Sequence, residues 1–210
     1  MLVTLPYELP ELVRSAPLAI HRSTVLPEWV DWNGHMNVAF YVLAFDRATG
    51  KLRWDRTACE IVPHEGRHET NTYASASPTT DGQRLYASFG SRGVYCYDLE
   101  GKLLWQRNLG DLRTRLGWGE GTSPAVHGET LVINRDQEEN SVIVSLNALT
   151  GEVRWQVPRD ELTSWATPLI REHDGKPQVI VNGTKRVRSY DLASGDLLWE
   201  CGGQTANVIP

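Results

Sequence analysis

Residues 44–54 read Ala-Phe-Asp-Arg-Ala-Thr-Gly-Lys-Leu-Arg-Trp, a turn in which an acidic residue precedes a glycine and a tryptophan follows the glycine after three residues. The chain of 210 residues contains four such turns, each beginning with Asp or Asn, and the spacing from Gly to Trp never varies. The four sets are Asp46, Gly50 and Trp54; Asp98, Gly101 and Trp105; Asn147, Gly151 and Trp155; and Asp191, Gly195 and Trp199. The tryptophans lie 51, 50 and 44 residues apart. A period in the forties predicts the four-stranded blades of a β-propeller.

Each residue type in this turn has a physical role. An Asp or Asn side chain accepts hydrogen bonds from the backbone ahead of it, and Gly takes a positive φ without steric cost. The large indole can pack between adjacent blades while its N–H donates to a neighbouring backbone. The alternative is that each tryptophan fills the interior of its own blade. We predict structural roles for Trp54, Trp105, Trp155, Trp199, Gly50, Gly101, Gly151 and Gly195.

A hydroxyl residue followed by proline marks the start of three blades, at Ser77-Pro78, Ser123-Pro124 and Thr167-Pro168. Proline suits the first residue of a strand because it cannot donate to a ladder. In the second blade we predict strands at 73–79, 84–90, 93–98 and 102–107. The predicted hairpin turns of the three blades are Asp81-Gly82, His127-Gly128 and Asp174-Gly175.

These landmarks predict an all-β fold with low helix content. The blades are expected at about 73–110, 122–160 and 165–203, after a partial blade at 42–60. The architecture is a partial β-propeller of three complete four-stranded blades, an open arc rather than a closed ring. An open arc leaves strand edges unpaired, so we predict self-association and low stability of the isolated chain.

Composition excludes several classes of protein. The net charge of −5 and the scattered basic residues argue against a nucleic-acid partner. The cysteines lack metal-ligand spacing, so no zinc site is predicted. The longest apolar run, 38–45, is too short to span a bilayer. Glu8 and Glu11 interrupt the apolar stretch that an export signal needs, so the sequence as written predicts a cytoplasmic protein.

Residues 44–54 resemble, position for position, the tryptophan-docking motif of the PQQ-like, or quinoprotein alcohol dehydrogenase-like, β-propellers, and 145–155 and 189–199 fit the same frame. The resemblance covers about 42–210 and is closer to bacterial PQQ-binding-like repeat proteins, relatives of the outer-membrane assembly propeller, than to true dehydrogenases. It implies a periplasmic or exported protein. True quinoproteins are expected to need a complete ring, calcium ligands and often adjacent cysteines. We therefore predict no cofactor, neither PQQ nor calcium, and keep PQQ-dependent oxidation as an alternative.

The segment before the repeats has a different resemblance. Residues 27–41 read Pro-Glu-Trp-Val-Asp-Trp-Asn-Gly-His-Met-Asn-Val-Ala-Phe-Tyr and look like the front of a hotdog-fold acyl-CoA thioesterase, with the likeness extending over about 16–48. It implies Asp31 and His35 as catalytic residues, with Asn37 beside them. The other strands of a hotdog domain do not follow.

We therefore predict a chimera, with a thioesterase-like fragment at 1–41 and propeller repeats at 42–210, joined near 45–49. The apolar residues in 38–45 have a spacing that fits one face of a helix, and their β-branched and aromatic content also fits a buried strand. A strand is predicted at 42–46, because the turn that follows needs a hairpin partner. Residues 18–26 are a candidate for a further strand of the first blade.

Two loops that enter blades carry the candidate ligand-binding residues. Residues 64–71, His-Glu-Gly-Arg-His-Glu-Thr-Asn, offer imidazoles and carboxylates for a divalent metal or for acid–base chemistry, and an Arg for an anion. A solvated connecting loop is the alternative, and no metal is predicted. Residues 117–122, Gly-Trp-Gly-Glu-Gly-Thr, lack the Lys of a phosphate-binding loop but offer a stacking surface. The predicted ligand-binding residues are His64, Glu65, Arg67, His68, Asn71, Trp118, Glu120 and Trp165.

The sequence thus supports two functions from different classes. The first is a non-catalytic binding or scaffold module that offers its loop face to a protein, peptide or carbohydrate. The second is an acyl-CoA thioesterase that acts through Asp31 and His35, with the carboxylate as base or nucleophile.

Overall fold

The computed structural model describes residues 39–45 through their backbone and residues 51–205 with their side chains. These residues form fourteen strands and the short 3-10 turns Gly90–Arg92 (η3) and Arg115–Gly117 (η4), with no α-helix among them. The chain divides into two units, and the described strands, apart from Phe45, belong to the unit made of Val38–Ala44 and Leu52–Pro210.

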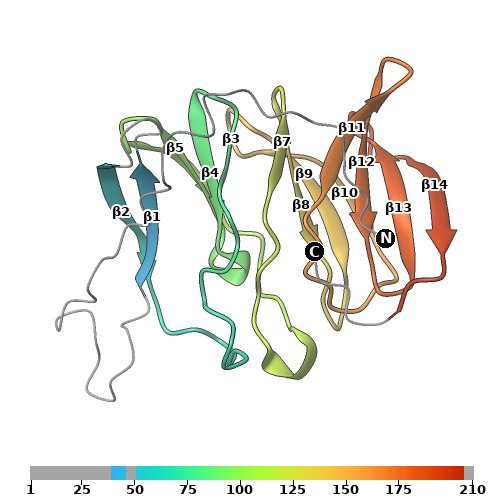
Figure 1. Cartoon of the computed structure of the whole chain (residues 1–210), viewed down its shortest axis with the longest axis horizontal. Helices are drawn as coiled ribbons and strands as arrows, with labels where there is room; N and C mark the ends of the chain where they lie inside the picture. The colour runs from blue at the N-terminus through green and yellow to red at the C-terminus, as the bar shows by residue number, and fades with distance from the viewer. Residues whose placement is uncertain (1–38, 46–50, 206–210) are drawn as a thin grey trace, which may run out of the picture. The chain divides into compact units, whose positions relative to one another are not determined.

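The strands form one two-stranded sheet and three four-stranded sheets (Figure 1). β1 (Ala39–Phe45) pairs with β2 (Leu52–Glu60). The second blade contains β3 (Thr79–Thr80), β4 (Arg84–Ser88), β5 (Val94–Asp98) and β6 (Leu103–Arg107). The third contains β7 (Ala125–His127), β8 (Thr130–Arg135), β9 (Val142–Asn147) and β10 (Val153–Pro158), and the fourth β11 (Leu169–His173), β12 (Lys176–Asn182), β13 (Arg186–Asp191) and β14 (Leu197–Gly202).

Within each blade consecutive strands pair antiparallel, in chain order. The expected all-β partial propeller, three complete blades after a partial one and unclosed, is confirmed. β1 confirms a strand rather than a helix before the first turn. The strand expected at 18–26 lies outside the described residues, as do Asp31, His35 and Asn37.

The first strand of the second blade is shorter than expected. A strand was expected over 73–79, but pairing begins only at Thr79, directly after Pro78. Upstream, the Ser75 hydroxyl donates to the carbonyl of Thr72 at 3.1 Å, and the Thr72 N–H donates to the Ser75 hydroxyl at 3.0 Å. Such local side-chain bonds compete with the ladder and hold 72–75 as a turn.

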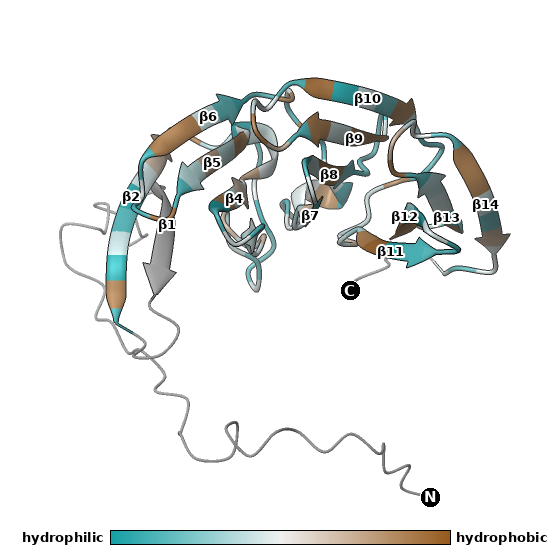
Figure 2. Ribbon diagram, turned by 90° about the horizontal axis from the view of Figure 1, so that it is seen from above, coloured by the Kyte–Doolittle hydropathy of each residue, from teal (hydrophilic) through white to brown (hydrophobic). Residues whose placement is uncertain are grey.

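Apolar side chains from the inner strands fill the interfaces between blades. β8 is buried along its whole length and β9 along most of it, because blades cover both faces of the third sheet. Alternate residues serve opposite neighbours: Leu131 and Ile133 cluster with Tyr86 of the second blade, and Val132 clusters with Val179 of the fourth. The edge strands β6, β10 and β14 instead mix hydrophobic and hydrophilic residues (Figure 2).

Three of the four tryptophans lie between two blades. Each indole N–H donates to a carbonyl in the turn of the following blade: Trp54 to Leu99 at 2.8 Å, Trp105 to Ala148 at 2.9 Å, and Trp155 to Leu192 at 3.0 Å. The prediction that the tryptophans join adjacent blades is therefore confirmed at these three positions.

The glycine makes this contact possible in the three described turns, whereas Gly50 lies outside the described residues. Gly101, Gly151 and Gly195 have φ of +84°, +72° and +80°, and a Cβ there would lie 2.7, 2.6 and 2.8 Å from the docked indole. In two of the interfaces an arginine adds a bond to the same glycine: the Nε of Arg56 donates to Gly101 at 2.9 Å, and that of Arg107 donates to Gly151 at 2.7 Å. Indole, glycine and turn thus form one repeated contact.

The fourth tryptophan is different. Trp199 on β14 is 42% exposed, whereas Trp54 is 8% exposed. Its indole N–H donates to the Oε1 atom of Gln178 in its own blade, at 3.0 Å. Within the described part of the chain no turn packs on this ring, so the expected role between blades is not seen at Trp199.

Candidate functional site

The loops that lead into the blades carry all eight residues predicted to bind a ligand. The loop from β2 to β3 carries five of them, the loop from β6 to β7 carries Trp118 and Glu120, and the loop from β10 to β11 carries Trp165. The loops meet through backbone bonds, since the His68 N–H donates to the carbonyl of Trp118 at 3.0 Å. His68 and Trp165, which are 97 positions apart in sequence, therefore line one surface.

Aromatic rings form the centre of this surface. The rings of Trp118 and Trp165 stack with their centroids 6.1 Å apart and an interplanar angle of 24°. The His68 ring meets Trp118 edge-on, at 5.8 Å and 76°. An open hollow of about 410 Å³ lies beside them, which we call the aromatic hollow; it is lined by His68, Thr70, Asn71, Ser75, Trp118, Gly121 and Trp165.

Hydrogen bonds fix the parts of the aromatic hollow. The indole N–H of Trp165 donates to the carbonyl of Gly119 at 2.8 Å, and the Asn71 amide donates to the carbonyl of Trp118 at 2.8 Å. Gly119 has φ of +89°, and a Cβ there would lie 2.8 Å from the Asn71 amide nitrogen. The loop glycine thus permits the close approach that holds both tryptophans in place.

The polar side chains of the hollow mostly bond to one another. The Oδ1 atom of Asn71 accepts from the N–H of Thr72 at 2.8 Å and from the hydroxyl of Ser75. The Nδ1 atom of His68 lies 2.8 Å from the hydroxyl of Thr70. Few of the hollow's polar groups are left to bind a ligand, so the surface it offers is mainly aromatic.

Arg67 faces its own loop rather than the hollow. Its Nη1 atom donates to the carbonyls of Asn71 at 2.8 Å and of His68 at 3.2 Å. Its guanidinium carbon lies 5.5 Å from the centroid of the Tyr73 ring. The side chain therefore stabilises the loop that carries His68 and Asn71, and it is not part of the hollow's lining.

His64, Glu65 and Glu120 form a separate cluster, whose ligand atoms lie within 4.8 Å of one another. Both ring nitrogens of His64 are engaged, Nε2 with the carbonyl of Leu112 at 2.6 Å and Nδ1 with the Nη2 atom of Arg92 at 2.9 Å. A nitrogen that accepts from a guanidinium has no lone pair left for a cation, and the arginine charge would repel one.

The two carboxylates of this cluster also have partners. Glu65 accepts from the N–H of Thr114 at 3.1 Å and from its hydroxyl at 2.5 Å. Glu120 accepts from the N–H of Ser91 at 2.7 Å and from its hydroxyl. Burial raises the pKa of Glu120, against the opposing effect of the Ser91 hydrogen bonds. The cluster fits a structural role that joins loops, and it does not fit a metal ion without rearrangement.

The cysteines of this chain do not supply the adjacent pair that the family resemblance associates with many quinone sites. Cys59, Cys96 and Cys201 lie on three different strands, β2, β5 and β14. Burial within the blade raises the pKa of the Cys96 thiol to about 12, so this sulfur is held as an inert thiol. No pair of neighbouring cysteines is available to contact a flat cofactor.

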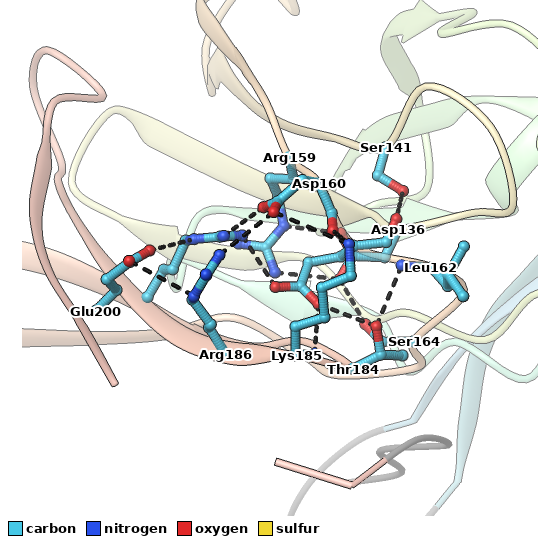
Figure 3. A network of polar contacts seen from close by, with 12 residues as sticks. Asp136, Ser141, Arg159, Asp160, Leu162, Ser164, Thr184, Lys185, Arg186 and Glu200 are labelled. Carbon is cyan, nitrogen blue, oxygen red and sulfur yellow. Dashed lines mark hydrogen bonds and ion pairs between the residues drawn. The ribbon is translucent and has the colours of Figure 1, made fainter. Parts of the chain in front are cut away.

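The sequence did not reveal a second polar cluster, which joins the third and fourth blades (Figure 3). Arg188 on β13 contacts Glu161 at 2.9 Å, Glu200 at 3.1 Å, and Asp160. Burial favours the neutral guanidine, but the hydrogen bonds to Glu200 and Asp160 outweigh it and raise the pKa of Arg188. The cluster is an ion-pair network between blades.

A fully buried ion pair lies next to it. The Nε atom of Arg159 is 2.7 Å from the Oδ1 atom of Asp136, and both side chains are 0% exposed. Arg159 also donates to the hydroxyl of Tyr190 at 2.8 Å and to the second oxygen of Asp136. The only feature of the sequence that could have indicated these ion pairs is the charged run at 159–161. A charged run after a strand does not show which residues it pairs with.

Comparisons with known proteins agree with the fold. The family model described as "Outer membrane protein assembly factor BamB" matches residues 39–207. BamB from Moraxella catarrhalis superposes with a TM-score of 0.52 at 16% identity, over 78% of this chain and 42% of that one. Quinohemoprotein alcohol dehydrogenase from Comamonas testosteroni has a TM-score of 0.45 at 17% identity, over 66% of this chain and 21% of that one. The likeness to the Moraxella catarrhalis protein concerns the fold alone.

A curated protein matches a short segment. Betainyl-CoA thioesterase from Pseudomonas aeruginosa is 53% identical over 38 residues, which is 18% of this chain and 24% of that protein. The chain thus covers less than half of each of these solved structures and about a quarter of the thioesterase. Among the described residues, none of the helical segments has the length and apolar character to cross a membrane.

Proposed function

Because the chain belongs to the family of the outer membrane protein assembly factor BamB, we propose that its blades form a non-catalytic binding or scaffold module whose ligand surface is the aromatic hollow. The observation that carries the proposal is the pair of stacked indoles, Trp118 and Trp165, beside an open hollow on the loop face. Rigid aromatic anchors of this kind dominate the energetics of protein interfaces.

The chemistry of the hollow favours binding over catalysis. His68 supplies the one imidazole of the hollow, and the described lining includes no carboxylate or thiol that could act with it. General acid–base and nucleophilic catalysis both need a second positioned group. The hollow has a surface for recognition and no paired reacting groups.

The preferred ligand is a peptide segment of a protein partner, with an apolar or aromatic side chain that enters the hollow. A sugar would need free donors and acceptors for its hydroxyls, but Asn71, Ser75 and Thr70 are committed to one another and to the loop. An apolar side chain needs only the indole surface and the removal of water from it.

Panning the purified protein against a displayed peptide library and a glycan array tests this function. Peptides with an aromatic or long aliphatic residue are expected to bind, and Trp118→Ala is expected to weaken binding at least about ten-fold, or 1.4 kcal/mol. Leu116→Ala is the matched control, because Leu116 is 79% exposed on the same loop and does not line the hollow. Peptide binding unaffected by Trp118→Ala, or binding only to glycans, would contradict the proposal.

A thioesterase activity at the N-terminal segment is the second candidate. It is favoured by the 38-residue match to Betainyl-CoA thioesterase and would use Asp31 and His35. A panel of acyl-CoA substrates, betainyl-CoA included, with detection of the released thiol tests it. We expect no turnover, since catalysis needs a supporting shell that 38 residues do not supply. Turnover that Asp31→Ala abolishes would replace the first function by the second.

The compartment is a separate proposal. We propose a periplasmic location, which the description of the matching family as an outer membrane assembly factor supports. Fractionation of cells that express the natural gene, with a periplasmic and a cytoplasmic marker, checks this. Recovery with the cytoplasmic marker would contradict it.

A further inference from the structure

A buried amide near the end of β8 has an oxygen without a hydrogen-bond partner. Asn134 is 1% exposed, and its Oδ1 atom has no partner among the described residues. Its Nδ2 atom donates to the Oδ2 atom of Asp136 at 3.1 Å, to the Oγ atom of Ser164 at 3.2 Å and to the carbonyl of Ala166 at 3.4 Å. Reversing the amide would turn its oxygen against a carboxylate and a carbonyl, so the unpaired atom is the oxygen.

Asn134 lines a narrow crevice among the loops that enter the blades. Ser75, Gly121 and Trp165 also line this crevice, and the same three residues line the aromatic hollow. The space that the centre of a water-sized sphere can occupy in the crevice is about 20 Å³. One water molecule needs roughly 10–15 Å³, whereas a side chain such as that of leucine needs far more room. The crevice therefore suits a ligand of about the size of water.

Two donors that line the crevice are committed elsewhere. The Ser164 hydroxyl donates to the Oδ2 atom of Asp136 at 2.6 Å, and Arg135, which is 4% exposed, donates to two backbone carbonyls. A metal ion is disfavoured at this place, because Arg135 is positively charged and Arg159 already pairs with Asp136. A neutral donor from outside the protein remains as the partner for the oxygen of Asn134.

We propose that the crevice is the binding site of an ordered water molecule, which donates one O–H to the Oδ1 atom of Asn134. Buried waters typically make about three hydrogen bonds to polar groups that have no other partner. Ser88 and Thr122 also line the crevice, and each carries a hydroxyl that can donate to the water or accept from it. Ser88 lies on β4 and Thr122 in the loop that enters the third blade, so the water links the second blade to the third.

A second buried polar atom gives a matched comparison. The Oγ atom of Ser145 on β9 also has no hydrogen-bond partner among the described residues, and Ser145 is 0% exposed. Ser145 does not line the crevice, and it lies within the third blade, where β9 pairs with β8 on one side and β10 on the other. An unpaired polar atom indicates a bound water only where there is space for one.

A crystal structure of the unmodified chain, at a resolution that shows ordered water, tests the proposal. The expected result is a water molecule about 2.5–3.0 Å from the Oδ1 atom of Asn134, with a second contact to a polar atom of the crevice. The proposal is overturned if the crevice holds no water, or if a metal ion or a donor of the protein itself contacts this oxygen.

Magnetic relaxation dispersion of the water oxygen tests the same site in solution, because it counts the waters that stay in the protein for long times. Asn134→Leu removes the acceptor at a similar side-chain volume and is expected to lose one long-lived water. Ser145→Ala is the matched control and is expected to keep the count of the unmodified chain. An unchanged count in Asn134→Leu overturns the proposal. Circular dichroism verifies the fold of both variants, and the crystal structure decides if Asn134→Leu does not fold. Neither measurement depends on a ligand in the aromatic hollow.

Discussion

Each blade has a turn between its third and fourth strands, which we call the outer turn, and loops at its other end that connect it to the neighbouring blades. The outer turns and these loops are built in opposite ways. At the outer turns one contact recurs three times, an indole on a glycine with a bond to the turn carbonyl. At the loop end each junction between blades is different. One has the hydrogen bond between His64 and Arg92, another has the aromatic hollow, and a third has the buried ion pairs.

This difference separates structural residues from candidates for recognition. A contact that recurs at every junction meets a need common to all blades, namely the burial of sheet faces that no blade can cover alone. A contact found at only one junction is not explained by this common need. The aromatic hollow is unique among the described loops and has open space beside it, which makes it the better candidate for binding.

The largest effect is expected from breaking the recurring contact. Trp105→Ala removes a ring packed on Gly151 and the bond to Ala148, and should lower the free energy of unfolding by about 3–5 kcal/mol. Trp199→Ala, at the undocked repeat, should cost about 1 kcal/mol or less in the monomer. Urea unfolding at low protein concentration measures both. Equal losses would mean that docking adds little to the stability of the array.

The loop end has its own stability test at the buried ion pair. Asp136→Asn leaves the guanidinium of Arg159 buried without its counter-charge and should cost about 3 kcal/mol. The control is Asp111→Asn, because Asp111 is 61% exposed and pairs with Arg92 at 2.9 Å; its loss should be below about 1 kcal/mol. A small loss at Asp136 would show that the recurring outer contact alone determines stability.

Two glycines with the same backbone angle isolate the docking contact from backbone strain. Gly151 and Gly175 both have φ of +72°, but a Cβ at Gly151 would lie 2.6 Å from the Trp105 ring, whereas one at Gly175 would meet nothing within 4 Å. Alanine should cost about 1–2 kcal/mol at either site, for the left-handed conformation. Gly151→Ala should cost a further 1–3 kcal/mol or so, for overpacking. Thermal and urea unfolding measure the difference, and a similar loss at both sites would contradict the steric argument.

The sequence predicted the outer turns well because their chemistry is local. An Asx residue, a glycine and a tryptophan at fixed spacing determine one turn and one contact. Each predicted hairpin glycine, Gly82, Gly128 and Gly175, has a positive φ. The same local reasoning was wrong at 73–78, where Thr72 and Ser75 bond to each other and prevent the strand.

The loop end was less predictable because its contacts join residues far apart in sequence. Nothing near Arg188 in the sequence indicates Glu161, and nothing near His64 indicates Arg92, which takes up its second ring nitrogen. The eight predicted ligand residues therefore separate into two sets: four line the hollow, and four hold the loops together. The sequence shows which polar groups are present, but only the structure shows their hydrogen-bond partners and therefore whether they can bind a ligand.

The smallest effect is expected at the hairpin turns between the first and second strands of two blades, β3 and β4 in one and β11 and β12 in the other. Although burial disfavours its charge, hydrogen bonds from Gln83, Tyr86 and Arg84 lower the pKa of Asp81 below the ordinary 3.8. The Oδ1 atom accepts the N–H groups of Gln83 and Arg84 at 2.8 and 2.6 Å, and Oδ2 accepts the Tyr86 hydroxyl at 2.8 Å. Asp174, at the equivalent turn of the fourth blade, is 88% exposed, and its Oδ2 atom lies 3.6 Å from the Nε2 atom of His173.

A lowered folded-state pKa means that Asp81 stabilises the fold when ionised, above pH 3.8, and that this contribution is lost as the pH falls through the folded value. Asp81→Asn should therefore cost about 1–2 kcal/mol at pH 7, as hydrogen bonds to a charged group do, and progressively less below pH 3.8. Asp174→Asn should cost little at pH 7, because its φ of +50° suits Asn as well as Asp. Urea unfolding across this pH range measures both variants. A pH-independent loss at Asp81 would mean that shape rather than charge holds the turn, and that the two hairpins differ only in packing.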